Sequence, residues 1–208
     1  MILPKHSKFH GWLLTLFLKN KFKSNFSKFE IAGKLELTQD KSILLIGNHS
    51  TWWDGFIGWH LNQTLFKKKF HVLMLEEQLK KFWFFRYCGA FGIQPNSRKT
   101  IESLELSKNI LNDPNNLLNY FPQGKFHSLY DLNPSFKKGI EKILIEKPTC
   151  QIIFFGIFFE FFENEKPMLK VYLEEFKNMN ENISKTDLEQ AFHQFLENCC
   201  FTQKMMPV

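Results

Sequence analysis

Two residues of this sequence have the types and spacing for acid–base chemistry: His49 and Asp54 stand five positions apart, directly after an apolar run. An ordinary imidazole can take the proton of an alcohol while the alcohol oxygen attacks an acyl carbon. An aspartate on the other ring nitrogen fixes the tautomer and stabilises the imidazolium that forms. Five steps along a continuous helix separate two side chains by about 140°, so the pair meets only if the chain turns between them. We expect His49 in a loop and Asp54 in the following helix; a buried histidine satisfied by a nearby acid is the structural alternative.

Two further segments carry residues suited to binding an anion. Residues 120–126, Tyr-Phe-Pro-Gln-Gly-Lys-Phe, contain a Pro-x-Gly turn that can bring backbone close to a ligand. Within them, Lys125 can supply a point charge for a phosphate. Residues 89–98 lead into a predicted helix and place Arg98 at its N-terminus, where backbone amides and the helix dipole favour anions. Each segment taken alone also fits a plain turn with a solvated base.

The elements that would position these residues alternate between strands and helices. Apolar or alternating runs predict strands at residues 42–47, 71–75, 117–121, 151–162 and 168–176, and the turn at 164–167 makes the last two a hairpin. Helical periodicity covers residues 99–111 and 136–146, and a capping box at 186–189 predicts the start of a C-terminal helix. This alternation predicts an α/β fold: a single domain with a central, mostly parallel or mixed sheet flanked by helices. In such sheets, chemistry gathers where strands end and helices begin.

Residues 1–30 form an N-terminal helical segment in this prediction, ahead of a main domain at residues 31–208. Residues 9–18 are a short apolar, aromatic run flanked by lysines, which is typical of an amphipathic helix in a membrane interface. A helix that packs on its own domain is the equal alternative. No run of 18 apolar residues exists, so a bilayer-spanning helix is not expected. No small-residue cleavage site follows the apolar run, which argues against a signal peptide.

Composition favours a lipid or phosphorylated partner over a nucleic acid. The 208 residues are 44% hydrophobic and include 25 Phe, and 27 Lys and Arg against 21 Asp and Glu give a net charge of +6. Only Arg86 and Arg98 are arginines, whereas nucleic-acid readers usually carry more. The four cysteines show neither metal-ligand spacing nor a secretory context. The basic, aromatic-rich chain therefore predicts an anionic membrane surface or a phosphorylated substrate, with no metal site and no nucleic-acid partner.

Taken together, these segments resemble the glycerolipid acyltransferase family, which includes the 1-acylglycerol-3-phosphate acyltransferases. The family's first motif, Asn-His, four residues and Asp, is met by Asn48, His49 and Asp54. Its second motif, a Gly-containing stretch closing on an Arg, is similar to residues 89–98, and its third, Phe-Pro-Glu-Gly, is similar to residues 121–124. The resemblance extends over residues 42–162 and includes a Phe-Lys-x-Gly after the third motif.

The resemblance implies an enzyme that moves a fatty acyl group from an acyl thioester to a hydroxyl of a glycerolipid or another lipid-like alcohol. His49 would be the general base and Asp54 the acid that orients it. A substrate-binding role is implied for Asn48, Arg98, Pro122, Gln123, Gly124 and Lys125. The thioester, on coenzyme A or on acyl carrier protein, is a substrate, and neither a resident cofactor nor a metal is implied.

Three departures from the family pattern bear on the acceptor. Gln123 replaces the usual Glu of the third motif, Phe126 stands where many members carry an Arg, and Phe154 stands in place of the fourth motif's Pro. These changes weaken the expectation of a phosphate on the acceptor more than the expectation of His–Asp chemistry. A phosphorylated acceptor and an uncharged lipid-like or sugar alcohol therefore both stay open.

Two other functions fit parts of the pattern. A metallophosphoesterase also uses an Asn-His pair after a strand, but it needs Gly-Asp segments, and the chain contains no Gly-Asp dipeptide. A non-enzymatic membrane- or lipid-binding protein would use the aromatic residues and lysines equally well, yet it gives no reason for the motifs at strand ends. The prediction is therefore a peripheral enzyme at the cytoplasmic face of the cell membrane.

Overall fold

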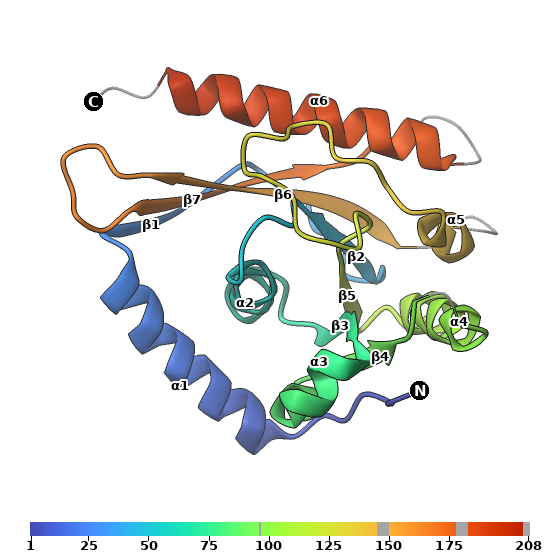
Figure 1. Cartoon of the computed structure of the whole chain (residues 1–208). Coiled ribbons are helices and arrows are strands. Elements are labelled where there is room, and N and C mark those ends of the chain that lie inside the picture. Colours follow the sequence, from blue (N-terminus) through green and yellow to red (C-terminus); the bar gives the residue numbers. More distant parts are fainter. Residues whose placement is uncertain (96, 145–149, 178–182, 206–208) are drawn as a thin grey trace.

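The computed structural model describes residues 1–95, 97–144, 150–177 and 183–205, and within them strands alternate with helices (Figure 1). The strands are β1 (Lys28–Ala32), β2 (Ile43–Gly47), β3 (Lys69–Leu75), β4 (Ala90–Ile93), β5 (Asn116–Tyr120), β6 (Gln151–Glu160) and β7 (Met168–Glu175). The helices are α1 (Lys8–Asn25), α2 (Asp54–Leu61), α3 (Glu76–Lys81), α4 (Lys99–Leu111), α5 (Gly139–Leu144) and α6 (Lys185–Lys204). A π-helical turn, η1 (Asn62–Phe66), follows α2, and a 3₁₀ turn, η2 (Trp83–Tyr87), follows α3.

A single mixed sheet runs through the described part of the chain in the order β1-β7-β6-β2-β5-β3-β4. The strands β2 to β6 pair in parallel, β7 runs antiparallel to β6, and β1 runs parallel to β7. This arrangement confirms the predicted α/β class, the mostly parallel sheet and the β6–β7 hairpin. Because the carboxyl ends of parallel strands meet at one edge of a sheet, the loops after β2, β4 and β5 all leave the same edge.

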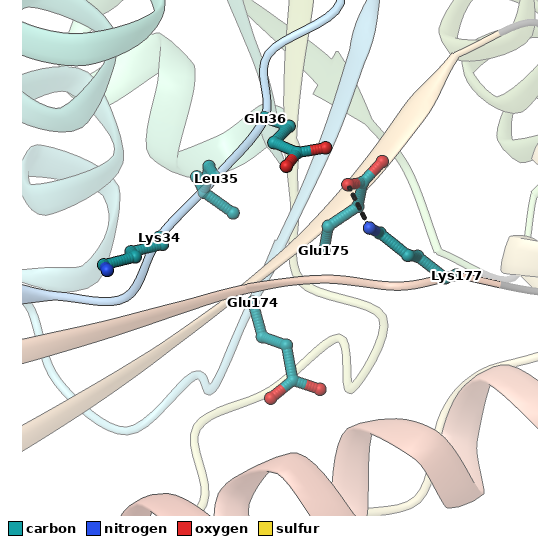
Figure 2. Close-up of a pocket in the computed structure, with 6 residues that line it drawn as sticks. All are labelled: Lys34, Leu35, Glu36, Glu174, Glu175 and Lys177. Carbon is teal, nitrogen blue, oxygen red and sulfur yellow. Dashed lines mark ion pairs between the residues drawn. The ribbon is translucent and has the colours of Figure 1, made fainter.

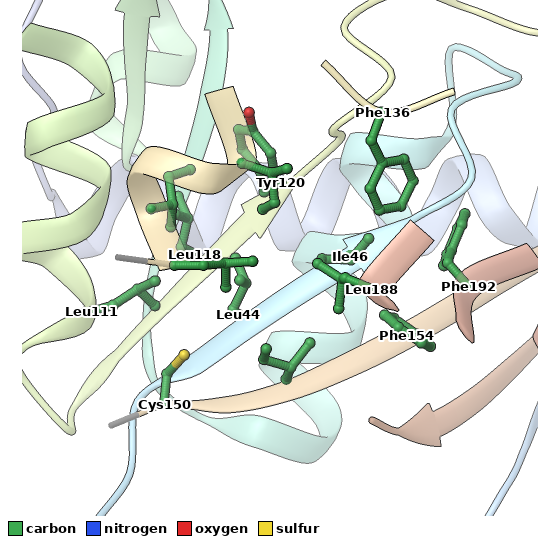
Figure 3. Close-up of a cluster of buried hydrophobic side chains, with 14 of the residues drawn as sticks. Leu44, Ile46, Leu111, Leu118, Tyr120, Phe136, Cys150, Phe154, Leu188 and Phe192 are labelled. Carbon is green, nitrogen blue, oxygen red and sulfur yellow. The ribbon is translucent and has the colours of Figure 1, made fainter. Parts of the chain in front are cut away.

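The two faces of the sheet fill two cores. Leu44 and Ile46 of β2 lie in the core shared with α4, α5 and α6, whereas Ile43 and Leu45 lie in the core shared with α1 and α2. This period of two is what a strand buried on both faces requires. Figure 1 shows α6 on one side of the sheet and α1 with α2 on the other, and Figure 3 shows side chains of the first core. The sheet is thus held between two helical layers, which makes β2 a rigid support for the residues that follow it.

Helix α1 presents apolar side chains on two sides. Its N-terminus is capped by Ser7, whose hydroxyl accepts the amide of His10. On one side, Leu14, Leu18 and Phe22 are buried in the core shared with α2. The other side exposes large apolar side chains: Phe9, Trp12, Leu13, Leu16 and Phe17. None of the described helices combines the length and the apolar composition needed to span a bilayer.

Strands β1 and β4 were not predicted from the sequence. β4 has four residues and lies inside the segment 89–98, which was interpreted only as the approach to a helix that begins near residue 99. β1 has five residues with exposed and half-buried side chains, so its sequence lacks a strong apolar pattern. Both are edge strands of the sheet. β4 is mostly buried but has only four residues, and β1 is short and partly exposed, so neither carries a clear apolar period in the sequence. Their pairing partners in the sheet identify them.

Two helix starts were predicted wrongly. The C-terminal helix begins at Lys185, because the Ser184 hydroxyl accepts a hydrogen bond from the amide of Asp187 at 3.1 Å and the Asp187 carboxylate accepts one from the amide of Ser184 at 3.4 Å. The capping box therefore spans residues 184–187 rather than 186–189. Helix α5 begins at Gly139 rather than at residue 136. The amide of Lys137 instead donates to the carbonyl of Pro122 at 2.7 Å, which ties this segment to the loop after β5. The predicted end of that helix, at 145–146, lies outside the described residues.

Candidate active site

The loop from β2 to α2 brings His49 and Asp54 together, as their spacing predicts. The Nδ1 atom of His49 lies 3.0 Å from Oδ2 of Asp54, which is fully buried as the first residue of α2. The same carboxylate accepts the amides of Ser50 at 2.7 Å and Thr51 at 2.9 Å, and the Thr51 hydroxyl at 2.5 Å. Asp54 is therefore fixed by three donors besides the imidazole. His49 retains an exposed fraction of 22% for its side chain, so its free edge can reach a substrate.

Asn48 ties the loop to the neighbouring strand. Its side-chain amide donates to the carbonyl of Ile157 at 3.1 Å and accepts the amide of Ile157 at 2.8 Å. This paired bond joins the end of β2 to β6 and leaves Asn48 buried. The Asn48 side chain is therefore hydrogen-bonded to the backbone of Ile157, and this contact helps to position His49, the next residue.

The loop after β5 is attached to the same end of β2. Gln123 is fully buried, and its Nε2 donates to the carbonyl of Gly47 at 3.1 Å. Its Oε1 is buried without a hydrogen-bond partner among the described residues. Four residues further on, the amide of His127 donates to the carbonyl of His49 at 2.8 Å. These two bonds hold the third motif beside the first.

The remaining predicted binding residues of this loop differ in exposure. Pro122 is buried, with its carbonyl bonded to Lys137. Gly124 is exposed with φ +66°, a left-handed conformation that favours glycine. Lys125 follows it and is exposed. The turn therefore exposes the backbone of Gly124 and the side chain of Lys125 at the surface.

Arg98 lies at the same edge of the sheet but not beside His49. It is exposed immediately before α4, which follows β4. In the sheet order, β4 is three strands away from β2, and three strand spacings amount to about 14 Å. The structure therefore gathers His49, Asp54, Asn48 and the 122–124 turn, whereas Arg98 follows a strand that is three positions away from β2 in the sheet.

Two aromatic side chains that the sequence interpretation did not assign to the site stack on His49. The ring centroid of Phe121 is 4.4 Å from that of the imidazole, with 19° between the planes, and that of Phe126 is 4.3 Å away, with 36°. The available signal was Phe126 itself, an aromatic residue where many family members carry Arg. A sequence pattern alone does not show that this ring faces the histidine.

A cluster of aromatic side chains, with Trp52 exposed and Phe56 buried, continues from the start of α2. Exposed Trp52 contacts Phe56 at 4.4 Å between ring centroids, and Phe56 contacts Phe85 of η2 at 5.6 Å. Trp53 packs inward on Phe26 at 5.1 Å. The site therefore has an apolar flank on the side of α2.

The described residues contain no group of three or more His, Cys, Asp or Glu side chains that could hold a metal ion. A surface pocket of about 550 Å³ lies elsewhere, lined by Lys34, Leu35, Glu36, Glu174, Glu175 and Lys177 (Figure 2). The carbonyl of Glu36 accepts from Gln151 at the start of β6, which puts this pocket at the edge of the sheet opposite to His49. The pocket is therefore separate from the histidine site.

Comparisons with known proteins identify the family and the fold. A family model described as Acyltransferase matches residues 28–157, more than half of the chain. The structure is similar to the crystal structure of the 1-acyl-sn-glycerophosphate (LPA) acyltransferase PlsC from Thermotoga maritima, with a TM-score of 0.62 and 16% identity over 94% of this chain and 81% of that chain. The comparison with curated proteins found no match. The chain therefore belongs to the acyltransferase family, as its motifs predict.

Proposed function

We propose that this acyltransferase moves a fatty acyl group from an acyl thioester to the hydroxyl of a glycerolipid or another lipid-like alcohol. The observation that carries the proposal is the His49–Asp54 contact at the end of β2, with Nδ1 bound to the buried carboxylate. That contact leaves Nε2 as the ring nitrogen available to a substrate.

In this mechanism His49 is the general base. Nε2 takes the proton of the acceptor hydroxyl while the oxygen attacks the thioester carbon, and Asp54 stabilises the imidazolium. The new C–O bond replaces the C–S bond, and the proton passes from Nε2 to the leaving sulfur as free thiol. Holding donor and acceptor together contributes ~7–11 kcal/mol, and the base contributes a factor of ~10²–10⁴.

The proposed substrates are inferred from the aromatic and basic side chains of the candidate active site. The donor is acyl-coenzyme A or acyl carrier protein, whose acyl chain would lie along Trp52, Phe56 and Phe85. Lys125 and Arg98 are exposed and would bind a polar headgroup or phosphate. No resident cofactor is part of the proposal.

The test is thiol release from both donor types with wild type, His49→Ala and Asp54→Asn. Glycerol 3-phosphate, lysophosphatidate and uncharged lipid alcohols serve as acceptors, with products identified by mass. We expect acceptor-dependent release that falls by ~10²–10⁴ in both variants. The control is His193→Ala, which removes a histidine bonded to Pro134 on the side of α6 and should keep activity. Equal activity in His49→Ala and wild type would contradict the mechanism.

We further propose that the protein acts as a peripheral protein at the cytoplasmic face of the cell membrane. The exposed side of α1 combines Phe9, Trp12 and Phe17 with the exposed Lys8, and Trp83 of η2 is also exposed. Aromatic rings in the interface and lysines near anionic headgroups are the usual components of such binding.

Vesicle sedimentation tests the membrane proposal. Trp12→Glu should weaken binding to vesicles that contain phosphatidylglycerol, whereas Phe201→Glu, an exposed position on α6, should not. Equal loss in both variants would count against α1 as the binding face. Wild-type binding without any turnover would favour the alternative, a non-enzymatic lipid-binding protein with this fold.

A further inference from the structure

The phenyl rings of Phe121 and Phe126 cover opposite faces of the His49 imidazole. Both rings lie within 4.4 Å of its centroid and within 36° of its plane. Two rings that close to a third ring cannot share one of its faces without overlapping. Because Asp54 holds Nδ1, the edge that carries Nε2 is the approach left for a substrate.

The two rings are held differently. Phe121 directly follows β5, is half-buried, and packs on Phe155 at 6.0 Å between ring centroids. Phe126 has an exposed fraction of 59%. Its position is set by the backbone, since the next amide, of His127, donates to the carbonyl of His49 at 2.8 Å. Phe121 is thus held in place by core packing, whereas Phe126 is an exposed ring that lies between the imidazole and solvent.

We propose that Phe126 is a positioning residue that makes the acceptor hydroxyl reach Nε2 in the plane of the imidazole and keeps water from this position. The in-plane direction is that of the Nε2 lone pair, along which a proton is transferred. This inference rests on the proposed function of His49 as general base.

The Phe126 ring would then favour attack on the thioester by the acceptor oxygen over attack by water. With the acceptor in place, its oxygen bonds to the acyl carbon, the C–S bond breaks, and the hydroxyl proton passes through Nε2 to the sulfur. If water takes the place of the acceptor, the same steps give a free fatty acid and the same thiol. Phe126 therefore controls the ratio of acyl transfer to hydrolysis, a quantity that general stability does not change.

The experiment compares Phe126→Ala with wild type, measuring thiol release with and without acceptor and identifying ester and fatty acid by mass. We expect kcat for transfer to fall by about 10- to 100-fold, because a displaced reacting group costs that much, while acceptor-independent hydrolysis rises. Phe126→Tyr keeps the ring and should restore the wild-type ratio. The matched control is Tyr130→Ala, which removes an aromatic side chain with an exposed fraction of 95% from the same loop.

The outcomes separate this inference from the proposed function. An unchanged ratio of ester to fatty acid in folded Phe126→Ala overturns the inference alone. An altered ratio in Tyr130→Ala as large as in Phe126→Ala also overturns it, because the loop and not the ring would then matter. Absence of thiol release from wild type with every donor and acceptor overturns the proposed function and this inference with it.

Discussion

Replacing Gln123 by glutamate should make the stability of this protein depend on pH. Gln123 is fully buried, its Nε2 donates to the carbonyl of Gly47 at 3.1 Å, and its Oε1 has no partner among the described residues. A protonated glutamate can keep the bond to Gly47 by donating its O–H. An ionised glutamate cannot, and its charge would face the carbonyl oxygen of Gly47.

The size of the effect follows from the burial. Full burial raises the pKa of a carboxyl by up to 3–5 units, and each unit corresponds to 1.36 kcal/mol, which gives a penalty of about 4–7 kcal/mol. In the Gln123→Glu variant, the folded pKa of the introduced carboxyl is thus raised above its unfolded value of about 4.3. The unfolded chain ionises first, so stability is lost as the pH rises from about 4.3 to the folded pKa and then stays constant.

Thermal unfolding of wild type, Gln123→Glu and Gln123→Met between pH 5 and 9 measures this effect. Gln123→Met loses the same hydrogen bond without adding a charge, so its loss of about 1–3 kcal/mol should not vary with pH. The gap between wild type and Gln123→Glu should widen with pH, by about 2–4 °C for each kcal/mol. A gap that stays constant, as with methionine, would refute the inference that this side chain lies in a dry site.

Two further changes test the packing around the site. Gly58→Ala places a Cβ 2.2 Å from Nδ2 of the buried Asn119 and should lower the free energy of unfolding by about 1–3 kcal/mol. Gly55→Ala, in the same helix, meets no atom within 4 Å and should raise that free energy by up to about 1 kcal/mol. Equal stability of the two variants in urea unfolding would contradict the close approach of Gly58 to Asn119. Burial, with the nearby charges of His6 and Lys69 as smaller causes, lowers the pKa of His71 from 6.5 to about 4. Between these two pH values the unfolded chain binds more protons than the folded chain, so the free energy of unfolding should fall by about 3 kcal/mol as the pH drops from 6.5 to 4. His71→Gln should remove this pH-dependent loss.

Local patterns in the sequence were sufficient for the central part of this protein. The apolar run before Gly47 predicts a strand buried on both faces, and β2 lies between the two cores. The five-residue spacing from His49 to Asp54 requires a turn between a strand and a helix, and the structure has that turn with the two side chains in contact. These features depend on residues close together in the chain, so their periodicity and spacing identify them.

The contacts of Asn48, Gln123 and Phe126 around His49 depend on the order of the strands in the sheet. Because β2 lies between β6 and β5, Asn48 bonds to β6 and Gln123 bonds to the end of β2. The Phe126 ring reaches His49 only because the loop after β5 folds back over the loop after β2. Strand order is set by how whole elements bury their apolar faces together, and no local pattern encodes it. The sequence by itself therefore determined the contact between His49 and Asp54, and the tertiary structure decided which side chains surround it.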